Sequence, residues 1–198
     1  MKKILCNSCL VLLLFLTSCH IPSYTFDLRS TRSAIKFEEG KYLLNDIKAT
    51  ESIREKLEGM VIEEFSPYLQ DDLTLVRNAR GVFIPFTIPE NPDTEFLERL
   101  KTGTSGYDYL VNVKTEVLSE DISDVKVGNI QNSEENLVTV SLEIFDLESA
   151  QSIYFQKVTG RLSAQDDSKD FSFAKGAKNM VVKSLKKILK RIEKNRIL

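Results

Sequence analysis

Residues 136–149, NLVTVSLEIFDLES, and residues 151–163, QSIYFQKVTGRLS, decide the fold of this chain. In the first stretch Val138, Val140, Leu142 and Ile144 alternate with polar residues, and a period of two predicts a strand with one buried face. Residues 146–150 make a tight reversal. The second stretch then runs back along the first, so we predict an antiparallel hairpin.

Two longer stretches have the apolar spacing of helices. The first begins at a capping box formed by Ser52 and Glu55 and ends at Pro67. Its inward-facing residues are predicted to be Ile53, Leu57, Met60, Val61, Phe65 and Leu69. The second closes the chain, with an apolar stripe at Ala174, Ala177, Val181, Leu185, Ile188 and Ile192.

Shorter elements lie between these. We expect strands at residues 41–48 and around Tyr109, Val111 and Val113, and a polar turn at about residues 122–135. Residues 73–78 and 82–86 alternate like short strands or an irregular edge. Asn91 and Pro92 should cap and open a short helix that the glycines of GTSG, residues 103–106, terminate. The order predicts an α+β fold, a mainly antiparallel sheet with two long helices packed on one face.

The amino-terminal segment has the pattern of a secretory signal. Lys2 and Lys3 precede an apolar run, residues 4–16. As a helix this run would be about 20 Å long, shorter than the roughly 30 Å hydrocarbon core of a bilayer, so cleavage is expected rather than spanning. Leu16-Thr17-Ser18-Cys19 follows and resembles the bacterial lipobox. The resemblance implies that Cys19 becomes the first mature residue and carries acyl chains.

The resemblance to lipoproteins sets the expected organisation and location. We expect a signal peptide at residues 1–18, a lipidated cysteine and flexible tether at residues 19–33, and one periplasmic domain at residues 34–198. In lipoprotein families an acidic residue after the cysteine retains the protein in the inner membrane. His20 occupies that position here. The resemblance therefore implies outer-membrane anchoring, facing the periplasm.

The residue types left in the domain exclude several chemistries. Cys6 and Cys9 lie in the signal, Cys19 would be acylated, and His20 is the sole histidine. Disulfides, thiolate nucleophiles, Ser-His-Asp catalysis and cysteine or histidine zinc sites are therefore not expected. Four adjacent carboxylate pairs are interpreted as solvated surface, because neighbouring side chains diverge. They are Glu38-Glu39, Glu63-Glu64, Asp71-Asp72 and Asp166-Asp167.

Charge is divided unevenly along the chain. Residues 20–170 carry a net charge of −12, and residues 171–198 carry +8. The closing helix could contact anionic headgroups or an acidic partner. The simpler alternative is attraction between this helix and the acidic body of its own domain. The candidate contact residues are Lys178, Lys183, Lys186, Lys187, Lys190 and Arg191.

The second half of the chain resembles a known periplasmic domain. GYDYLVNVKTEVL enters a strand, VTVSLEIFDLESAQSIYFQKVTG forms strand, turn and strand, and an amphipathic helix follows. This pattern is similar to the α/β domain of curli-secretion lipoproteins (CsgG-like), penicillin-binding-protein activator lipoproteins (LpoB-like) and the TolB amino-terminal domain. It implies the fold and assigns no functional residue. Tyr107, Asp108 and Tyr109 are interpreted as a packed edge or as an interaction corner.

Three functions follow from these observations. The first is a non-catalytic, lipid-anchored envelope lipoprotein that docks a periplasmic protein of the assembly, secretion or cell-wall machinery. The second is a structural or antigenic lipoprotein with no dedicated ligand, and the third is an enzyme that uses carboxylates. We favour the first, with no cofactor, no metal and no nucleic-acid partner expected.

Overall fold

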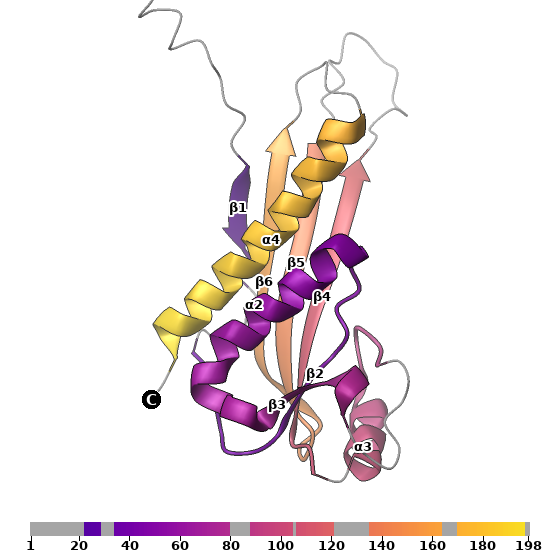
Figure 1. Ribbon diagram of the computed structural model, residues 1–198, viewed down its shortest axis with the longest axis vertical. Helices are drawn as coiled ribbons and strands as arrows, with labels where there is room; N and C mark the ends of the chain where they lie inside the picture. Colours follow the sequence, from indigo (N-terminus) through magenta and orange to yellow (C-terminus); the bar gives the residue numbers. More distant parts are fainter. Residues whose placement is uncertain are drawn as a thin grey trace, which may run out of the picture.

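A six-stranded sheet forms the framework of the protein, in the strand order β1-β6-β5-β4-β2-β3 (Figure 1). The computed structural model describes residues 22–28, 34–79, 88–104, 106–120, 135–163 and 170–196. The elements are β1 (Ser23–Phe26), β2 (Tyr42–Leu44), α2 (Glu51–Leu69), η1 (Gln70–Asp72), β3 (Leu73–Leu75), η2 (Val76–Asn78), α3 (Thr94–Gly103), β4 (Tyr109–Glu120), β5 (Glu135–Asp146), β6 (Gln151–Ser163) and α4 (Asp170–Asn195). The predicted α+β class is confirmed.

The predicted hairpin is formed by β5 and β6, which pair antiparallel along their whole lengths. The four alternating apolar residues of β5 are fully buried. The reversal between the strands is held by Asp146, whose Oδ1 accepts hydrogen bonds from the backbone N–H of Glu148 at 2.8 Å and of Ser149 at 3.3 Å. An aspartate that bonds the backbone two residues on is a common turn former.

The sheet is mixed, so the prediction of a mainly antiparallel sheet is only partly right. β1, β6, β5 and β4 pair antiparallel, whereas β2 pairs parallel with both β4 and β3. The physical reason lies in α2, which connects β2 to β3. A long helical crossover returns the chain to the same end of the sheet, and the next strand then runs parallel to the previous one.

The two long helices, α2 and α4, cover one face of the sheet, but the prediction of the helical layer is only partly right because a third helix, α3, packs elsewhere (Figure 1). Phe65 of α2 and Leu185 of α4 belong to one core cluster with Val140 and Leu142 of β5. All four side chains are fully buried. Burying an aliphatic or aromatic side chain contributes roughly 1.5–3 kcal/mol. This layer is therefore the main source of stability.

The short helix α3 packs on a second apolar cluster. Leu97 and Leu100 of α3 lie with Leu43, Leu110 and Phe145, whose chain neighbours Leu44, Val111 and Ile144 belong to the main core. Because side chains alternate along a strand, the second cluster is on the opposite face of the sheet. Its helix begins two residues later than predicted, and the side chain of Asp93 rather than Asn91 caps it by accepting a hydrogen bond from the Phe96 N–H at 2.8 Å.

The segment that we expected to be a flexible tether contains an edge strand. β1 pairs antiparallel with β6, in a register that places Ser23 opposite Arg161 and Phe26 opposite Val158. Tyr24 and Phe26 pack against the core under α4, while Ser23 and Thr25 are exposed. The alternation of these four residues is that of a strand with one buried face. Cys19 and His20 lie outside the described residues.

Several local predictions need correction. Thr50 rather than Ser52 precedes α2, and its backbone carbonyl, not a capping box, accepts the N–H groups of Ile53 and Arg54. The helix continues through Pro67 to Leu69. The predicted strand at residues 41–48 is limited to β2, and that at residues 73–78 to β3. The predicted strand at residues 82–86 and the turn up to residue 134 lie outside the described residues, as does Asp166-Asp167.

Candidate functional site

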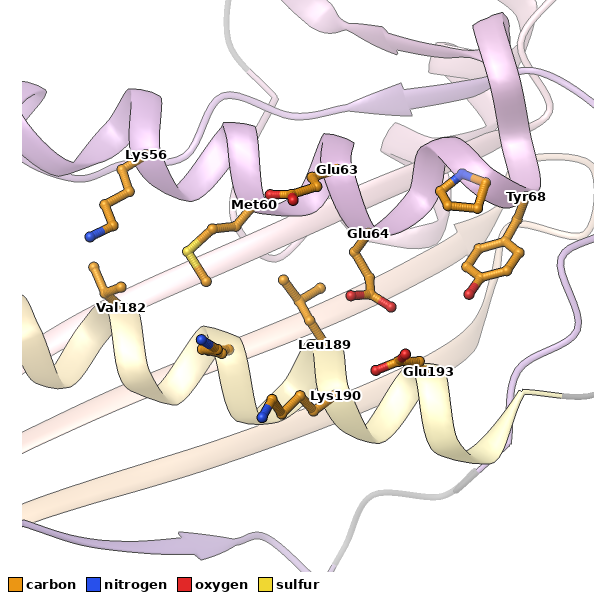
Figure 2. A pocket seen from close by; sticks show the side chains of 11 residues that line it. Lys56, Met60, Glu63, Glu64, Tyr68, Val182, Leu189, Lys190 and Glu193 are labelled. Atoms are coloured by element: carbon orange, nitrogen blue, oxygen red, sulfur yellow. The ribbon is translucent and has the colours of Figure 1, made fainter.

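A groove of about 580 Å³ lies between α2 and α4 on the outer side of the helical layer (Figure 2). Its apolar lining comes from Met60 and Tyr68 on α2 and from Val182 and Leu189 on α4. Met60, Tyr68 and Val182 are only partly buried, so they offer accessible apolar surface. Six of the eleven lining residues are charged and the other five are apolar, so the groove offers a mixed surface.

Charged residues surround the groove, and their sign changes from one end to the other. Lys56 lies beside Val182 at one end of the groove, and Glu64 and Glu193 lie beside Tyr68 at the other end (Figure 2). Lys186 also lines the groove, seven residues or about 10 Å before Glu193 along α4. The groove therefore has a basic end near Lys56 and an acidic end near Tyr68, with Glu63 and Lys190 between them.

The acidic end holds two carboxylates whose charges repel. Burial raises the pKa of Glu64, and repulsion from Glu193 raises it further, while Arg196 acts in the opposite direction. The Arg196 guanidinium lies 4.6 Å from the ring centroid of Tyr68, so it is stacked on an aromatic side chain beside this end. A cationic group of a ligand would relieve the repulsion between Glu64 and Glu193.

Two of the predicted contact residues point to the other side of α4, over β1. The Lys187 ammonium lies 5.0 Å from the ring centroid of Tyr24, and the Arg191 guanidinium lies 4.5 Å from that of Phe26. A cation over an aromatic ring contributes about 0.5–1 kcal/mol at an exposed site. Lys187 and Arg191 thus help to hold the edge strand against the helix.

The remaining predicted residues are separated along α4. Lys178 donates a hydrogen bond to the Ser52 hydroxyl of α2 at 3.1 Å, Lys183 is exposed, and Lys186 and Lys190 line the groove. Between the α4 cations and the carboxylates that the structure describes, no ion pair within 4 Å is found. The alternative of intramolecular attraction stays open, because Arg196, the residue after α4, attracts Glu64 and acts to lower its pKa.

The Tyr107–Tyr109 corner is a packed edge. Tyr107 is buried, and the ring of Tyr109 stacks on Tyr42 at a centroid distance of 4.4 Å. Asp108 accepts hydrogen bonds from the Lys41 N–H at 3.0 Å and from the Lys101 ammonium at 3.1 Å. Burial opposes its ionisation, but these two donors outweigh burial and lower the pKa of Asp108. These contacts give the corner a structural role.

A smaller polar hollow of about 130 Å³ lies on the sheet face opposite the helical layer. Burial raises the pKa of Glu143 there, and a hydrogen bond from the Ser152 hydroxyl lowers it in part. Lys114 pairs with Glu116 at 2.7 Å and with Glu90 at 3.9 Å, and both of these carboxylates line the same hollow.

The adjacent carboxylate pairs behave differently from one another. Glu38 and Glu39 are exposed, as are Asp71 and Asp72, in agreement with a solvated surface. Glu63 and Glu64 instead both line the groove. Over the residues with described positions, no group of three or more histidine, cysteine or acidic side chains is arranged to hold a metal ion. Over the same residues, no helix has the length and apolar character needed to cross a membrane.

Comparison with known proteins gives only distant structural similarities. No protein-family profile and no curated sequence matches the chain. A minor lipoprotein from Acinetobacter baumannii is 13% identical with a TM-score of 0.42, over 78% of this chain and 94% of that one. The PelC dodecamer protein from Paraburkholderia phytofirmans is 12% identical with a TM-score of 0.35, over 83% and 95%. Lipoprotein B from Nitrosomonas europaea is 13% identical with a TM-score of 0.35, over 83% and 88%. At these scores the similarity assigns no function.

Sequence reasoning found the α4 side of the groove but missed the α2 side. Met60 was assigned to the apolar stripe of its helix, and Glu64 to solvated surface. Both line the groove because α4 packs alongside α2. The sequence does hold one signal of the exposure of Met60. Val61 lies in the centre of the apolar stripe of the helix, so Met60, its neighbour, lies at the edge of that stripe.

Proposed function

We propose that this protein is a non-catalytic, lipid-anchored lipoprotein of the cell envelope that binds a periplasmic protein in the groove between α2 and α4. The anchor proposal rests on LTSC directly behind an apolar signal, and the outer-membrane location rests on His20 after the cysteine. The observation that carries the binding proposal is the groove itself, with accessible apolar surface between two charged ends.

The groove specifies the chemistry of its partner. Apolar side chains of the partner would contact Met60 and Val182, with an acidic group near Lys186 and a basic group near Glu193. An amphipathic segment of a protein supplies this combination, since helices that dock in grooves present apolar anchors between charged residues. The two charged ends would fix the direction in which the segment lies.

Site-specific crosslinking in cells tests the groove. A photo-crosslinker at Val182, in the groove, is compared with one at Ile62, which is exposed on α2 and does not line the groove. We expect an envelope protein to be captured from position 182 only. Lys186→Glu should then reduce the yield several-fold, because it reverses a positive charge of the groove lining. Lys41→Glu, the same change at an exposed position outside α4 and outside the groove lining, should leave the yield unchanged.

Two results would contradict the binding proposal. One is equal capture from positions 182 and 62, or equal loss of yield with Lys186→Glu and Lys41→Glu. The other is a product with twice the mass of the chain, which would identify a second copy rather than a different protein as the occupant. Matched thermal unfolding of all variants ensures that the yield reports on the groove and not on folding.

The anchor is tested by mass and by partition. The native protein should have the mass of a chain that starts at Cys19 plus acyl groups, and it should remain with membranes. A Cys19→Ala form should lack the acyl mass. A native chain that begins elsewhere and carries no lipid would overturn the anchor proposal.

A further inference from the structure

We propose that one face of α4 lies on the anionic headgroups of the bilayer that holds the acyl chains of Cys19. This membrane face consists of Lys183, Lys187, Lys190 and Lys194. The inference rests on the proposed lipid anchor and extends it, because it assigns an orientation to the domain and a role to four lysines of which only Lys190 also borders the groove.

The first support is the spacing and exposure of the four lysines. Successive members are four, three and four residues apart, which places them on a single side of a helix. All four are exposed. Glu193 is the only acidic residue between residues 176 and 196, and it lines the groove rather than the membrane face. The membrane face therefore carries four positive charges and no negative charge from its own helix.

The second support is the short length of chain between the anchor and the domain. Only residues 20–22 separate Cys19 from Ser23, the first residue of β1. Four residue steps span at most about 14 Å. Had residues 19–33 all been tether, the limit would have been about 46 Å. Because β1 is part of the sheet, the bilayer surface must lie close to the point where β1 begins.

The third support is that α4 passes beside that point. The Lys187 ammonium lies 5.0 Å from the ring of Tyr24, the residue next to Ser23. The anchor and the membrane face are therefore on the same side of the molecule. Electrostatic attraction in physiological salt falls off over about 8 Å, and a linker of at most about 14 Å allows the lysines to come within that distance of the bilayer. Each lysine near an anionic surface strengthens binding by about fivefold.

The charge of the remaining domain favours the same orientation. Residues 20–170 have a net charge of −12, and an anionic surface repels them. The electrostatic energy is therefore lowest when α4 faces the lipid and the acidic body faces away from it.

The test measures how the domain of the acylated protein is oriented on a vesicle. Binding alone would not be informative, because the acyl chains hold the protein on vesicles of any composition. The native protein is reconstituted in phosphatidylcholine vesicles, with or without phosphatidylglycerol, that contain a headgroup quencher. A fluorophore is placed at Asn179→Cys, one turn before Lys183 and exposed, or at Glu98→Cys on α3, on the opposite side of the sheet. We expect several-fold stronger quenching at position 179 than at position 98, and only with phosphatidylglycerol.

A pair of variants with the same charge change separates a specific face from net charge. Replacing the four lysines of the membrane face by glutamine should abolish the effect of phosphatidylglycerol. Replacing Lys36, Lys41, Lys48 and Lys157 by glutamine, none of which lies on α4 or lines the groove, should preserve it. Thermal unfolding of both variants confirms that they are folded.

The outcomes distinguish failure of this inference from failure of the anchor. Acylated protein that stays on the vesicles but is quenched equally at positions 179 and 98, or equally with and without phosphatidylglycerol, overturns the membrane face alone. An equal effect of both four-lysine variants overturns it as well. A protein that carries no acyl group and leaves the vesicles overturns the anchor, and the orientation inference with it.

Discussion

Arg77 donates hydrogen bonds to both carboxylate oxygens of Glu58, at 2.8 and 2.7 Å. The Glu58 side chain is 3% exposed and that of Arg77 is 43% exposed, so the pair joins a buried acid to a half-exposed base. Arg77 also donates to Asp46 at 3.1 Å. The pair thus connects η2 to α2 and to the segment that follows β2.

Removal of the base should therefore destabilise the domain. Arg77→Ala leaves the carboxylate of Glu58 without its partner in a buried position. Breaking a fully buried pair costs 3–5 kcal/mol, and because water reaches Arg77 we expect a loss of about 2–3 kcal/mol in the free energy of unfolding. Urea denaturation measures it. The double variant Glu58→Leu, Arg77→Leu should recover part of the loss, and a single variant as stable as the native protein would refute the prediction.

The groove should respond to pH through Glu64. Burial and repulsion from Glu193 raise its pKa above the ordinary value of a glutamate, so the folded protein favours the protonated form. That contribution to stability is complete below the unfolded pKa and is lost as pH rises through the folded pKa. Glu64→Gln should be more stable than the native protein at pH 7, by less than about 1 kcal/mol because the group is partly exposed, and no more stable in acid.

The partner of Glu64 supplies the control for this effect. Glu193→Gln should lower the pKa of Glu64, as measured by carboxyl chemical shifts during a pH titration. An unchanged pKa would mean that burial alone is responsible.

The attachment of β1 should depend on Gly160. A Cβ atom at this position would lie 3.0 Å from Cε1 of Tyr24 and 3.3 Å from Cε of Met180. Gly160→Ala should push Tyr24 away from β6 and cost about 1–3 kcal/mol, as overpacking does. Hydrogen exchange should show loss of protection at residues 23–26. Gly176→Ala, where the nearest atom would be 3.9 Å away, is the matched control, and equal protection in both variants would exclude this contact.

The buried side-chain amides of Asn45 and Asn112 should be coupled in their contributions to the free energy of unfolding. Asn45 donates to Oδ1 of Asn112 at 2.8 Å, and Asn112 donates to the backbone carbonyl of Glu90 at 2.7 Å. Asn112→Ala removes both bonds, and we expect a loss of about 2–3 kcal/mol because buried polar groups lose their partners. A double-mutant cycle with Asn45→Ala measures the coupling. Additive losses would show that the two side chains act independently.

The parts of the fold that were predicted correctly are the elements whose apolar residues recur with one period over a long stretch of sequence. β5 alternates over its whole length, and the helical stripe of α4 repeats over several turns, so many residues support one interpretation. β2 has three residues, and Tyr42, Leu43 and Leu44 are all buried, so it shows no alternation. Its parallel pairing with β4 aligns Tyr42 with Tyr109 and depends on the path of the chain between them, which no local pattern records.

The candidate site was predictable only in part for the same reason. The spacing of the lysines on α4 predicts that they are exposed, but not which surface lies beside each of them. Lys187 lies over Tyr24 because β1 is the edge strand next to β6, and Lys186 borders the groove because α2 packs on the other side of α4. Both neighbours come from segments more than a hundred residues away.

The pairing of the first strand with the last has a consequence for folding during synthesis. Ser23 and Arg161 are 138 residues apart. β1 is therefore synthesised early but has no strand to pair with until β6 has been synthesised. Until then Tyr24 and Phe26 remain in water, while β4, β5 and β6 can associate through contacts between consecutive segments. A chain interrupted before residue 158 can form much of its central sheet and still lacks every partner of β1. The amino-terminal strand can therefore dock only after the chain has been synthesised through its partners in β6.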